Sequence, residues 1–330
     1  MSNASTATDR INWIDCIKGI GIYFVILGHI YKCNNIGMWI YSFHMPLFFI
    51  LSGYLIADKL TVPCYSEYFK KKFKSLIIPF ILFRIALILY WWVVESGFRK
   101  LDLGPIWFLP ILFSIEITIV PILLRHRSLL MTSVYLLINE TLFLALKSYP
   151  YSSFLYWILL YLNGSVWLLW GGVIRNIKIL NVTALRGGGT VILFLVSILG
   201  FKINGSVSMY SSVTNNYILY TLFGLSGSLF IFGVCRNFIV KNAFLEYIGM
   251  NTITILAIHE PIKRVVLKIS EITCSHIGFD WSIDYIQNNI LFGFIISCIV
   301  LFSTIPIIKT LHYVKLKTGK IGSYILNFVK

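Results

Sequence analysis

Charged residues are scarce in this chain of 330 residues. Asp, Glu, Lys and Arg together make up 12% of the sequence, whereas soluble domains average about 25%. Hydrophobic residues make up 58% and recur in long runs from the first residues to the last. This composition leaves no stretch for a large soluble domain. It predicts a polytopic membrane protein, with residues 1–330 forming a single membrane domain that has short tails at about 1–10 and 312–330.

Acidic residues are fewer still, with 13 against 28 basic residues, which gives a net charge of +15. A strongly positive chain can indicate a nucleic-acid partner. Here, however, the basic residues lie in short loops between apolar runs, and no nucleic-acid-binding motif is visible. Basic residues in such loops act as topology signals. We therefore expect contact with membrane lipids and no nucleic-acid partner.

Other motifs are also missing. The six cysteines are scattered, with no CxxC pair and no spacing typical of metal ligands, so most are expected to be packing residues. The triplet Gly187–Gly189 lacks the Lys-Ser/Thr of a phosphate-binding loop, which favours a flexible connector. No repeat of 20–50 residues occurs, and this excludes a solenoid.

The apolar runs divide into ten segments near the length of about 20 residues that crosses a bilayer. They cover approximately residues 11–31, 38–57, 76–95, 106–124, 129–146, 152–174, 189–203, 214–234, 243–267 and 290–311. The fifth and seventh are short, and polar residues interrupt the ninth. Most of the basic residues in the loops fall on the side that holds the N-terminus. We therefore predict an all-α bundle of about ten transmembrane helices with both termini cytoplasmic.

The first apolar run carries Asp15, Lys18 and His29 where hydrocarbon side chains would be expected. Lys18 and His29 are eleven positions apart, which on a helix places them on one stripe about 16 Å apart. Ionisable groups within a span face a bundle interior or a water-filled cavity, and this makes them functional candidates. Alternatively, Lys18 extends to the cytoplasmic interface with Asp15 as its partner, and His29 merely ends the helix.

Two further histidines fall on the same, outer side of the expected bundle. His44 lies at the start of the second span, and His259 lies beside Glu260 in the ninth. Imidazole is the usual general base for a hydroxyl acceptor. The alternatives are three interfacial histidines or a metal site. A metal is less favoured because the usual carboxylate-rich spacing is missing, so we expect none.

A basic segment precedes the third span on the cytoplasmic side. Its lysines are Lys70, Lys71, Lys72 and Lys74. Lysines at this position usually determine topology or contact anionic lipids. They could equally hold a polyphosphate ligand that arrives from the cytoplasm.

Three more ionisable residues, Arg84, Glu116 and Glu140, lie within apolar runs. An Arg–Glu pair between helices would neutralise both charges, although the sequence does not say which pairs form. Trp107 at the outer start of the fourth span fits an aromatic belt, and a substrate platform is the alternative.

Together these residues resemble the acyltransferase 3 family of integral membrane acyltransferases. The first two motifs are specific: Asp15-x-x-Lys18-Gly19 followed by His29, and residues 43–49 (Phe-His-Met-Pro-Leu-Phe-Phe) leading into 52–54 (Ser-Gly-Tyr). Looser matches are Lys71-x-x-Lys74, residues 107–109 (Trp-Phe-Leu), and the segment from Tyr247 through His259. The resemblance covers nearly the whole chain. Lysines stand at 71 and 74 where the family has arginines, which keeps the charge but loses bidentate phosphate geometry.

The resemblance implies transfer of an acyl group, most often acetyl, from cytoplasmic acyl-CoA to a hydroxyl of an extracytoplasmic glycan. His29 would then be the catalytic base, and Lys18 with Asp15 would support the donor or position the site. Lys71 and Lys74 would contact the CoA phosphates. The candidates for substrate binding are His44, Trp107, Glu116 and His259.

The expected donor is therefore acetyl-CoA, and the expected acceptor is an O-antigen, capsule or exopolysaccharide, either free or lipid-linked. The protein would lie in the cytoplasmic membrane of a bacterium, alone or beside separate glycan-assembly proteins. Two alternatives stay open. One is a transporter or exporter of a glycan intermediate or small solute through Lys18, His29 and Glu116, although no inverted hydropathy repeat supports it. The other is a protein that only anchors a glycan-assembly complex.

Overall fold

The computed structural model describes residues 12–31, 34–57, 64–94, 104–125, 128–150, 152–179, 187–278, 282–283, 285, 289–319, 322, 326 and 328–329. Within these ranges the chain is helical, without a β-strand beyond the isolated bridge between Ser208 and Val213. The α-helices are α1 (Asn12–Ile30), α2 (Asn35–Ala57), α3 (Tyr65–Lys72), α4 (Ile78–Val94), α5 (Phe108–Arg125), α6 (Leu129–Lys147), α7 (Ser153–Asn176), α8 (Gly188–Asn204), α9 (Tyr217–Val234), α10 (Ala243–Met250), α11 (Thr252–Ile277) and α13 (Ile290–Lys317). Two π-helical turns, η1 (Phe73–Ile77) and η5 (Cys235–Ile239), and a 3₁₀ turn, η2 (Gly104–Ile106), extend these helices.

The predicted all-α polytopic bundle is confirmed. Eight helices of the described chain are long and apolar enough to cross a membrane, and they match eight of the ten expected spans. The other two are the runs that looked irregular in the sequence. Helix α8 is apolar but shorter, Gly188–Asn204. The ninth run is divided at Asn251 into α10, which carries Glu246, and α11, which carries Glu260, Lys263 and Arg264.

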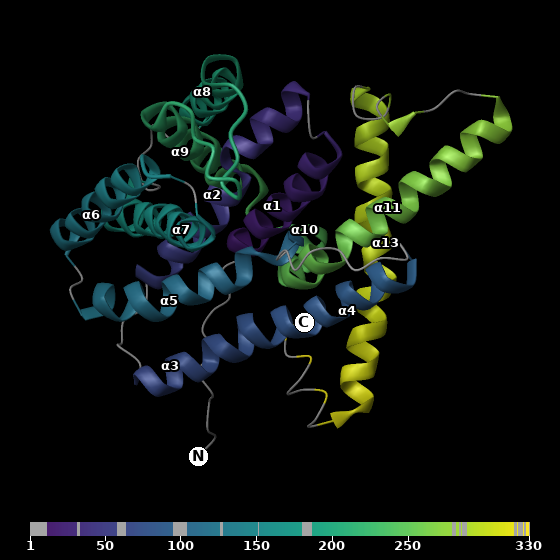
Figure 1. Cartoon of the computed structure of the whole chain (residues 1–330), viewed down its shortest axis with the longest axis horizontal. Coiled ribbons are helices and arrows are strands. Elements are labelled where there is room, and N and C mark those ends of the chain that lie inside the picture. The colour runs from purple at the N-terminus through teal and green to yellow at the C-terminus, as the bar shows by residue number, and fades with distance from the viewer. Residues whose placement is uncertain are drawn as a thin grey trace.

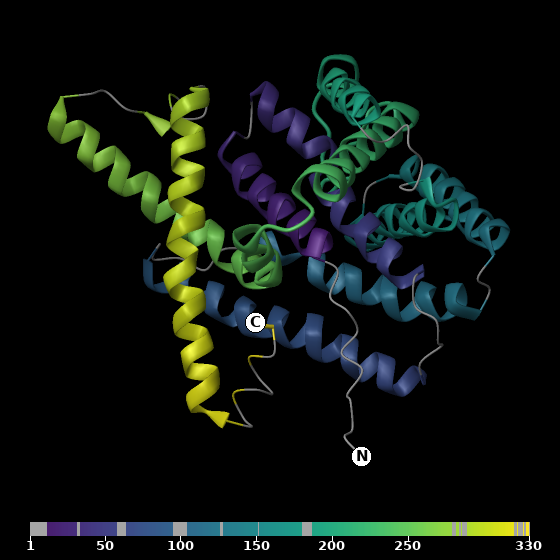
Figure 2. The same cartoon turned by 180° about the vertical axis from the view of Figure 1, so that it is seen from behind.

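Helices α1 and α2 occupy the middle of the molecule. Helices α6 to α9 lie to one side of them, and α10, α11 and α13 lie to the other (Figure 1 and Figure 2). The continuous rod made by α3, η1 and α4 passes below α1, α2 and α6 to α9 in this view, with α5 beside its first half (Figure 1). Most residues of α1 and α2 are buried, whereas α4 buries few. The two central helices therefore form the inner part of the bundle.

The central helices approach their neighbours at glycines. A Cβ atom on Gly53 of α2 would overlap the carbonyl of Leu168 on α7, and one on Gly171 would overlap the carbonyl of Ile50. On the other side, a Cβ on Gly249 of α10 would overlap the carbonyl of Asp15. Small residues at such contacts let helix backbones pack closely where the hydrophobic effect between helices is weak. These contacts fix α1 and α2, and with them the side chains that α1 and α2 carry.

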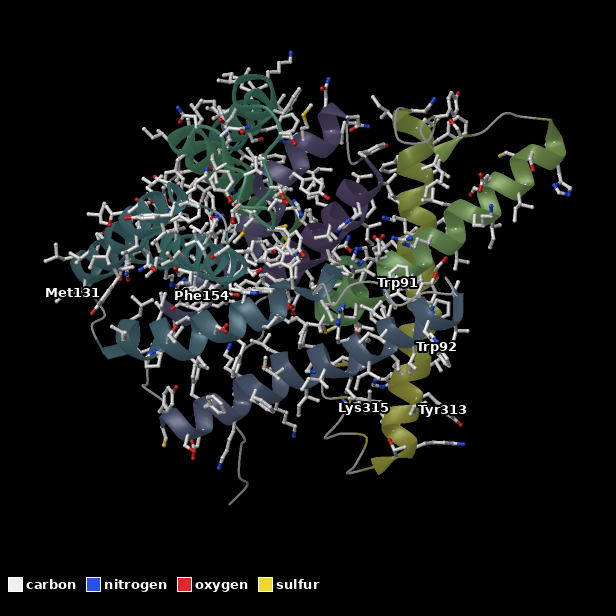
Figure 3. All side chains as sticks on the ribbon, viewed as in Figure 1. Trp91, Trp92, Met131, Phe154, Tyr313 and Lys315 are labelled. Atoms are coloured by element: carbon white, nitrogen blue, oxygen red, sulfur yellow. The ribbon has the colours of Figure 1, made fainter. Side chains whose placement is uncertain are left out.

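The outer surface is rich in large apolar side chains. Trp92 on α4 is 55% exposed and Phe154 on α7 is 76% exposed. Figure 3 shows Met131 and Trp92 at the periphery of the bundle. A surface of this kind is unfavourable in water over so many helices but matches the hydrocarbon of a bilayer.

The ends of α1 meet different parts of the chain. Its first turn, at Trp13, contacts Tyr54 at the end of α2 and Phe232 near the end of α9, with ring centroids 6.0 and 6.1 Å away. Its last residues meet the start of α13, where the Tyr31 hydroxyl donates a hydrogen bond to the Ile290 carbonyl. If successive spans alternate in direction, the start of α1 and the ends of α2 and α9 fall on one side of the membrane. The end of α1 and the start of α13 fall on the other side, and the observed contacts agree with this.

The packing predicts a strong effect for Gly171→Ala. The added methyl group overlaps the backbone of α2, so the two helices must separate, and we expect a loss of about 1–3 kcal/mol in stability. The measurement is the thermal unfolding midpoint of the purified protein in detergent. Gly188→Ala is the matched control, because a Cβ at Gly188 meets no atom within 4 Å. Equal midpoints for the two variants would contradict this account of the α2–α7 contact.

Candidate active site

A cavity of about 460 Å³ lies where the second half of α1 meets α2 and α11. Ligand pockets commonly have volumes of about 300–1,000 Å³. Its walls come from five parts of the chain: Val25 and His29 of α1; Met38, Tyr41, His44 and Met45 of α2; Gly104, Pro105 and Trp107 before α5; residues 206–211; and Leu256, Glu260 and Lys263 of α11. Segments far apart in the sequence thus meet at one chamber that contains several ionisable side chains.

His29 lies in the last turn of α1, with its side chain 28% exposed towards this chamber. Its Nδ1 atom is 3.9 Å from Oε2 of Glu260. The imidazole ring also faces His259, with 5.1 Å between the ring centroids. The expectation that histidines from separate helices converge with an acid is met for His29, His259 and Glu260.

Glu260 is held by cations of its own helix. Lys263, one turn later on α11, places Nζ 2.7 Å from Glu260 Oε2, and Arg264 places Nε 3.4 Å from Oε1. The Arg264 guanidinium lies 4.5 Å from the ring centroid of Trp91 on α4. Lys263 also donates a 3.5 Å hydrogen bond to the carbonyl of His29. These pairs compensate the cost of placing a carboxylate in an apolar bundle, and they fix it beside the imidazole.

His259 and His44 have the same internal arrangement. Nδ1 of His259 donates to the carbonyl of Leu256 at 2.8 Å, and Nδ1 of His44 donates to that of Ile40 at 2.8 Å. Since a carbonyl only accepts hydrogen bonds, Nδ1 carries the proton and Nε2 is left as an acceptor in each neutral ring. Nε2 of His259 is fully buried and has no hydrogen-bond partner among the described residues. This ring therefore offers an acceptor nitrogen next to His29.

His29, His259 and Glu260 could also be considered as metal ligands. One ligand atom from each lies within 4.8 Å of the others. The ammonium group of Lys263, however, already lies against the Glu260 carboxylate. A divalent cation at this position would be repelled by that ammonium. The charges therefore suit proton transfer better than metal binding.

Lys18 and Asp15 lie at the opposite end of α1. Lys18 Nζ is 3.2 Å from Asp15 Oδ1, with the lysine side chain 32% and the aspartate 6% exposed. This is the ion pair that the alternative interpretation of Lys18 expected. Neither residue lines the cavity. Any role of this pair would therefore be at the N-terminal end of α1, away from His29.

Trp107 lines the cavity, as a substrate-binding residue would. The 3₁₀ turn η2 carries it there, and its ring lies 5.6 Å from that of Tyr210. Glu116, two and a half turns further along α5, does not line the cavity. It pairs with Lys72 and accepts a 2.9 Å hydrogen bond from Tyr68.

The structure also shows partners for the two remaining carboxylates within the apolar runs, Glu116 and Glu140. The partner of Glu116 is Lys72, not Arg84, and Glu140 accepts a 3.3 Å hydrogen bond from Trp170. Lys72 therefore turns inwards. Lys71 is exposed, and Lys74 is half-buried within η1. Two of the four lysines in this segment, Lys70 and Lys71, thus present exposed ammonium groups.

Two parts of the chamber are not indicated by the sequence patterns. Lys263 counts in the sequence only as a loop charge. Residues 206–211 count only as a connection between two apolar runs. The available clue was composition, because Ser206, Ser208 and Ser211 are unusually frequent hydroxyls for a short link between two spans.

Comparison with known proteins identifies the family of the chain. A family model described as "Acyltransferase domain" matches residues 11–309, which include every cavity residue. Nodulation protein NolL of Sinorhizobium fredii (strain NBRC 101917 / NGR234) is 35% identical over 98 residues, and the match spans 26% of this chain and 26% of that relative. No solved structure shows a significant match. The chain belongs to the acyltransferase domain family, and it is a multi-pass membrane protein.

Proposed function

We propose that this protein transfers an acetyl group from cytoplasmic acetyl-CoA to a hydroxyl of a surface glycan, with His29 as the general base. The observation that carries the proposal is the position of the His29 imidazole, which opens onto the cavity and has the Glu260 carboxylate 3.9 Å away. The membership in an acyltransferase family supplies the reaction class. The glycan would be an O-antigen, capsule or exopolysaccharide, free or lipid-linked, at the cytoplasmic membrane of a bacterium.

The proposed chemistry balances without a metal or redox partner. His29 removes the proton of the acceptor hydroxyl as its oxygen attacks the thioester carbonyl. The carbon–sulfur bond breaks, the acetyl ester forms, and the CoA thiolate leaves with the proton returned by the imidazolium. Glu260 stabilises that imidazolium, and Lys263 in the cavity wall faces the negative charge that develops on the carbonyl oxygen. Transfer through an acetyl-histidine is the variant of this scheme.

The donor would approach from the Lys18 end of α1. Lys18 and His29 are about 16 Å apart along α1. The long, flexible arm of CoA would span this distance by extending into the bundle. The exposed ammonium of Lys71 and the half-buried ammonium of Lys74 would attract its phosphates. The Asp15–Lys18 pair at the first turns of α1 would border the same entry.

Replacing His29 with Gln should lower acetyl transfer by a factor of about 10²–10⁴, the usual contribution of a general base. The measurement is transfer from labelled acetyl-CoA to glycan in membrane vesicles, at equal protein levels. His276→Gln is the matched control, because His276 is an exposed residue on α11. Transfer at the wild-type rate in His29→Gln would exclude His29 as the base.

Glu260→Gln should mainly reduce kcat. The carboxylate stabilises the imidazolium in the transition state, and loss of an interaction equivalent to one pKa unit corresponds to about a tenfold change. We therefore expect kcat to fall at least about tenfold while the KM for acetyl-CoA changes little. Glu271→Gln, at an exposed ion pair of the same helix, controls for the charge change. A higher KM for acetyl-CoA with an unchanged kcat would argue against this role.

The double variant Lys71→Gln/Lys74→Gln should raise the KM for acetyl-CoA. Exposed charge pairs are weak, so we expect about a threefold to tenfold effect that shrinks at high salt. Steady-state kinetics at two salt concentrations provide the measurement. Lys202→Gln, at an exposed residue near the end of α8, should leave the KM unchanged. If both variants behave alike, the CoA phosphates bind elsewhere.

A further inference from the structure

The link between α8 and α9 is a tightly held hairpin. Ser208 and Val213 exchange two backbone hydrogen bonds, of 2.8 and 2.9 Å. Ser212 N donates to the carbonyl of Met209 at 3.1 Å and closes the turn between them. Two of its residues, Val207 and Met209, are only 3% and 2% exposed. Residues 206–213, called here the 206–213 hairpin, thus have a defined conformation of their own.

Asparagine side chains fasten the base of the hairpin. Asn204 Nδ2 donates to the carbonyl of Thr214 at 3.1 Å, and its Oδ1 accepts from the backbone N–H of Asn216 at 3.0 Å. Asn215 Nδ2 donates to the carbonyl of Ser206 at 2.9 Å. Lys147, at the end of α6, donates to the Thr214 hydroxyl. Because several independent hydrogen bonds hold both arms of the hairpin, its side chains are preorganised for binding.

The hairpin turns hydroxyl groups towards the cavity. Ser206, Ser208 and Ser211 all line it. The Ser208 hydroxyl donates to that of Ser211 at 3.3 Å, and the Ser206 hydroxyl has no hydrogen bond to any described residue. A hydroxyl both donates and accepts, which suits a ligand that itself carries several hydroxyls.

An aromatic surface adjoins these hydroxyls. Tyr210 of the hairpin and Trp107 both line the cavity, their rings tilted by 47° with centroids 5.6 Å apart. Tyr156 of α7 supports Tyr210 from another side at 6.0 Å. Aromatic rings bury the apolar face of a ligand, and their polar atoms keep contact with its polar edge. This wall therefore offers aromatic rings for the apolar face of a sugar ring and hydroxyls for its polar groups.

The reactive groups belong to the rest of the same chamber. His29 of α1 and Glu260 of α11 line the cavity together with the hairpin. A ring bound by the hairpin would therefore lie in one chamber with the imidazole that must deprotonate it. An apolar acceptor would make no hydrogen bond with the serine hydroxyls, whereas a hydroxylated acceptor could both donate to them and accept from them.

We propose that the 206–213 hairpin is the acceptor-recognition element and that it binds a polyhydroxylated sugar ring through Ser206, Ser208, Ser211 and Tyr210. This inference rests on the proposed function and adds the part of the chain that selects the acceptor. Its residues contact the acceptor and not the donor, so they control the KM for the acceptor.

The test uses the full chain in nanodiscs, with acetyl-labelled acetyl-CoA and de-O-acetylated surface glycan from the source strain. Ser208→Ala and Ser211→Ala should each raise the KM for the glycan about threefold to tenfold, the effect of one lost hydrogen bond. Tyr210→Leu should raise it by a similar factor. The KM for acetyl-CoA and the slow hydrolysis of acetyl-CoA by water should stay unchanged.

Two further variants separate recognition from folding. Ser275→Ala, at an exposed serine near the end of α11 and outside the cavity lining, should behave as wild type. Ser208→Thr keeps the hydroxyl and should retain most of the affinity for the glycan. Glycan transfer that is unaffected in all hairpin variants would overturn this inference and leave the acyltransfer proposal intact. Transfer by the wild type to octan-1-ol but not to glycan would overturn both.

Discussion

The site depends on a carboxylate that the bundle must keep charged. Glu260 lies among apolar helices, where an isolated carboxylate would be prohibitively costly. Lys263 and Arg264, on the same helix, compensate its charge. The ring of Trp91 on α4 in turn contacts the Arg264 guanidinium. The ion cluster therefore ties α11 to α4 and, through the Lys263 hydrogen bond to the His29 carbonyl, to α1. The position of His29 follows from that network.

Such a network needs helices that do not shift relative to one another. Helix–helix contact in a membrane gains little from the hydrophobic effect, so close backbone packing must supply the stability. Gly53 and Gly171 provide it between α2 and α7, and Gly249 provides it between α10 and α1. The same contacts place His44 and His29 on neighbouring walls of one cavity. Packing far from the chamber thus sets its geometry.

Hydropathy predicted most of the fold because span length and apolar composition are local properties. Two runs gave a different result, since α8 is short and Asn251 divides the ninth. The convergence of His29, His259 and Glu260 could also be predicted, because an alternating topology assigns each helix end to a side. The pairing of Glu116 with Lys72 could not, since it depends on which helix faces α5 and on how Lys72 turns inwards from α3. The serines at 206–211 were missed because a hairpin between spans has no helical period to read.

The polar groups at the two ends of α1 differ in how they are paired, although all of them lie in one membrane-spanning helix. Asp15 and Lys18 form an ion pair within one turn of the helix, and this pairing offsets part of their desolvation cost. His29 has no such local partner on its own helix, and its carboxylate comes from α11. His259 keeps a buried acceptor nitrogen without a partner in the described chain. Groups left unsatisfied at such a cost are retained where a substrate or a moving proton completes them. That difference, more than the presence of charge, distinguishes the His29 end of α1 as the place for chemistry.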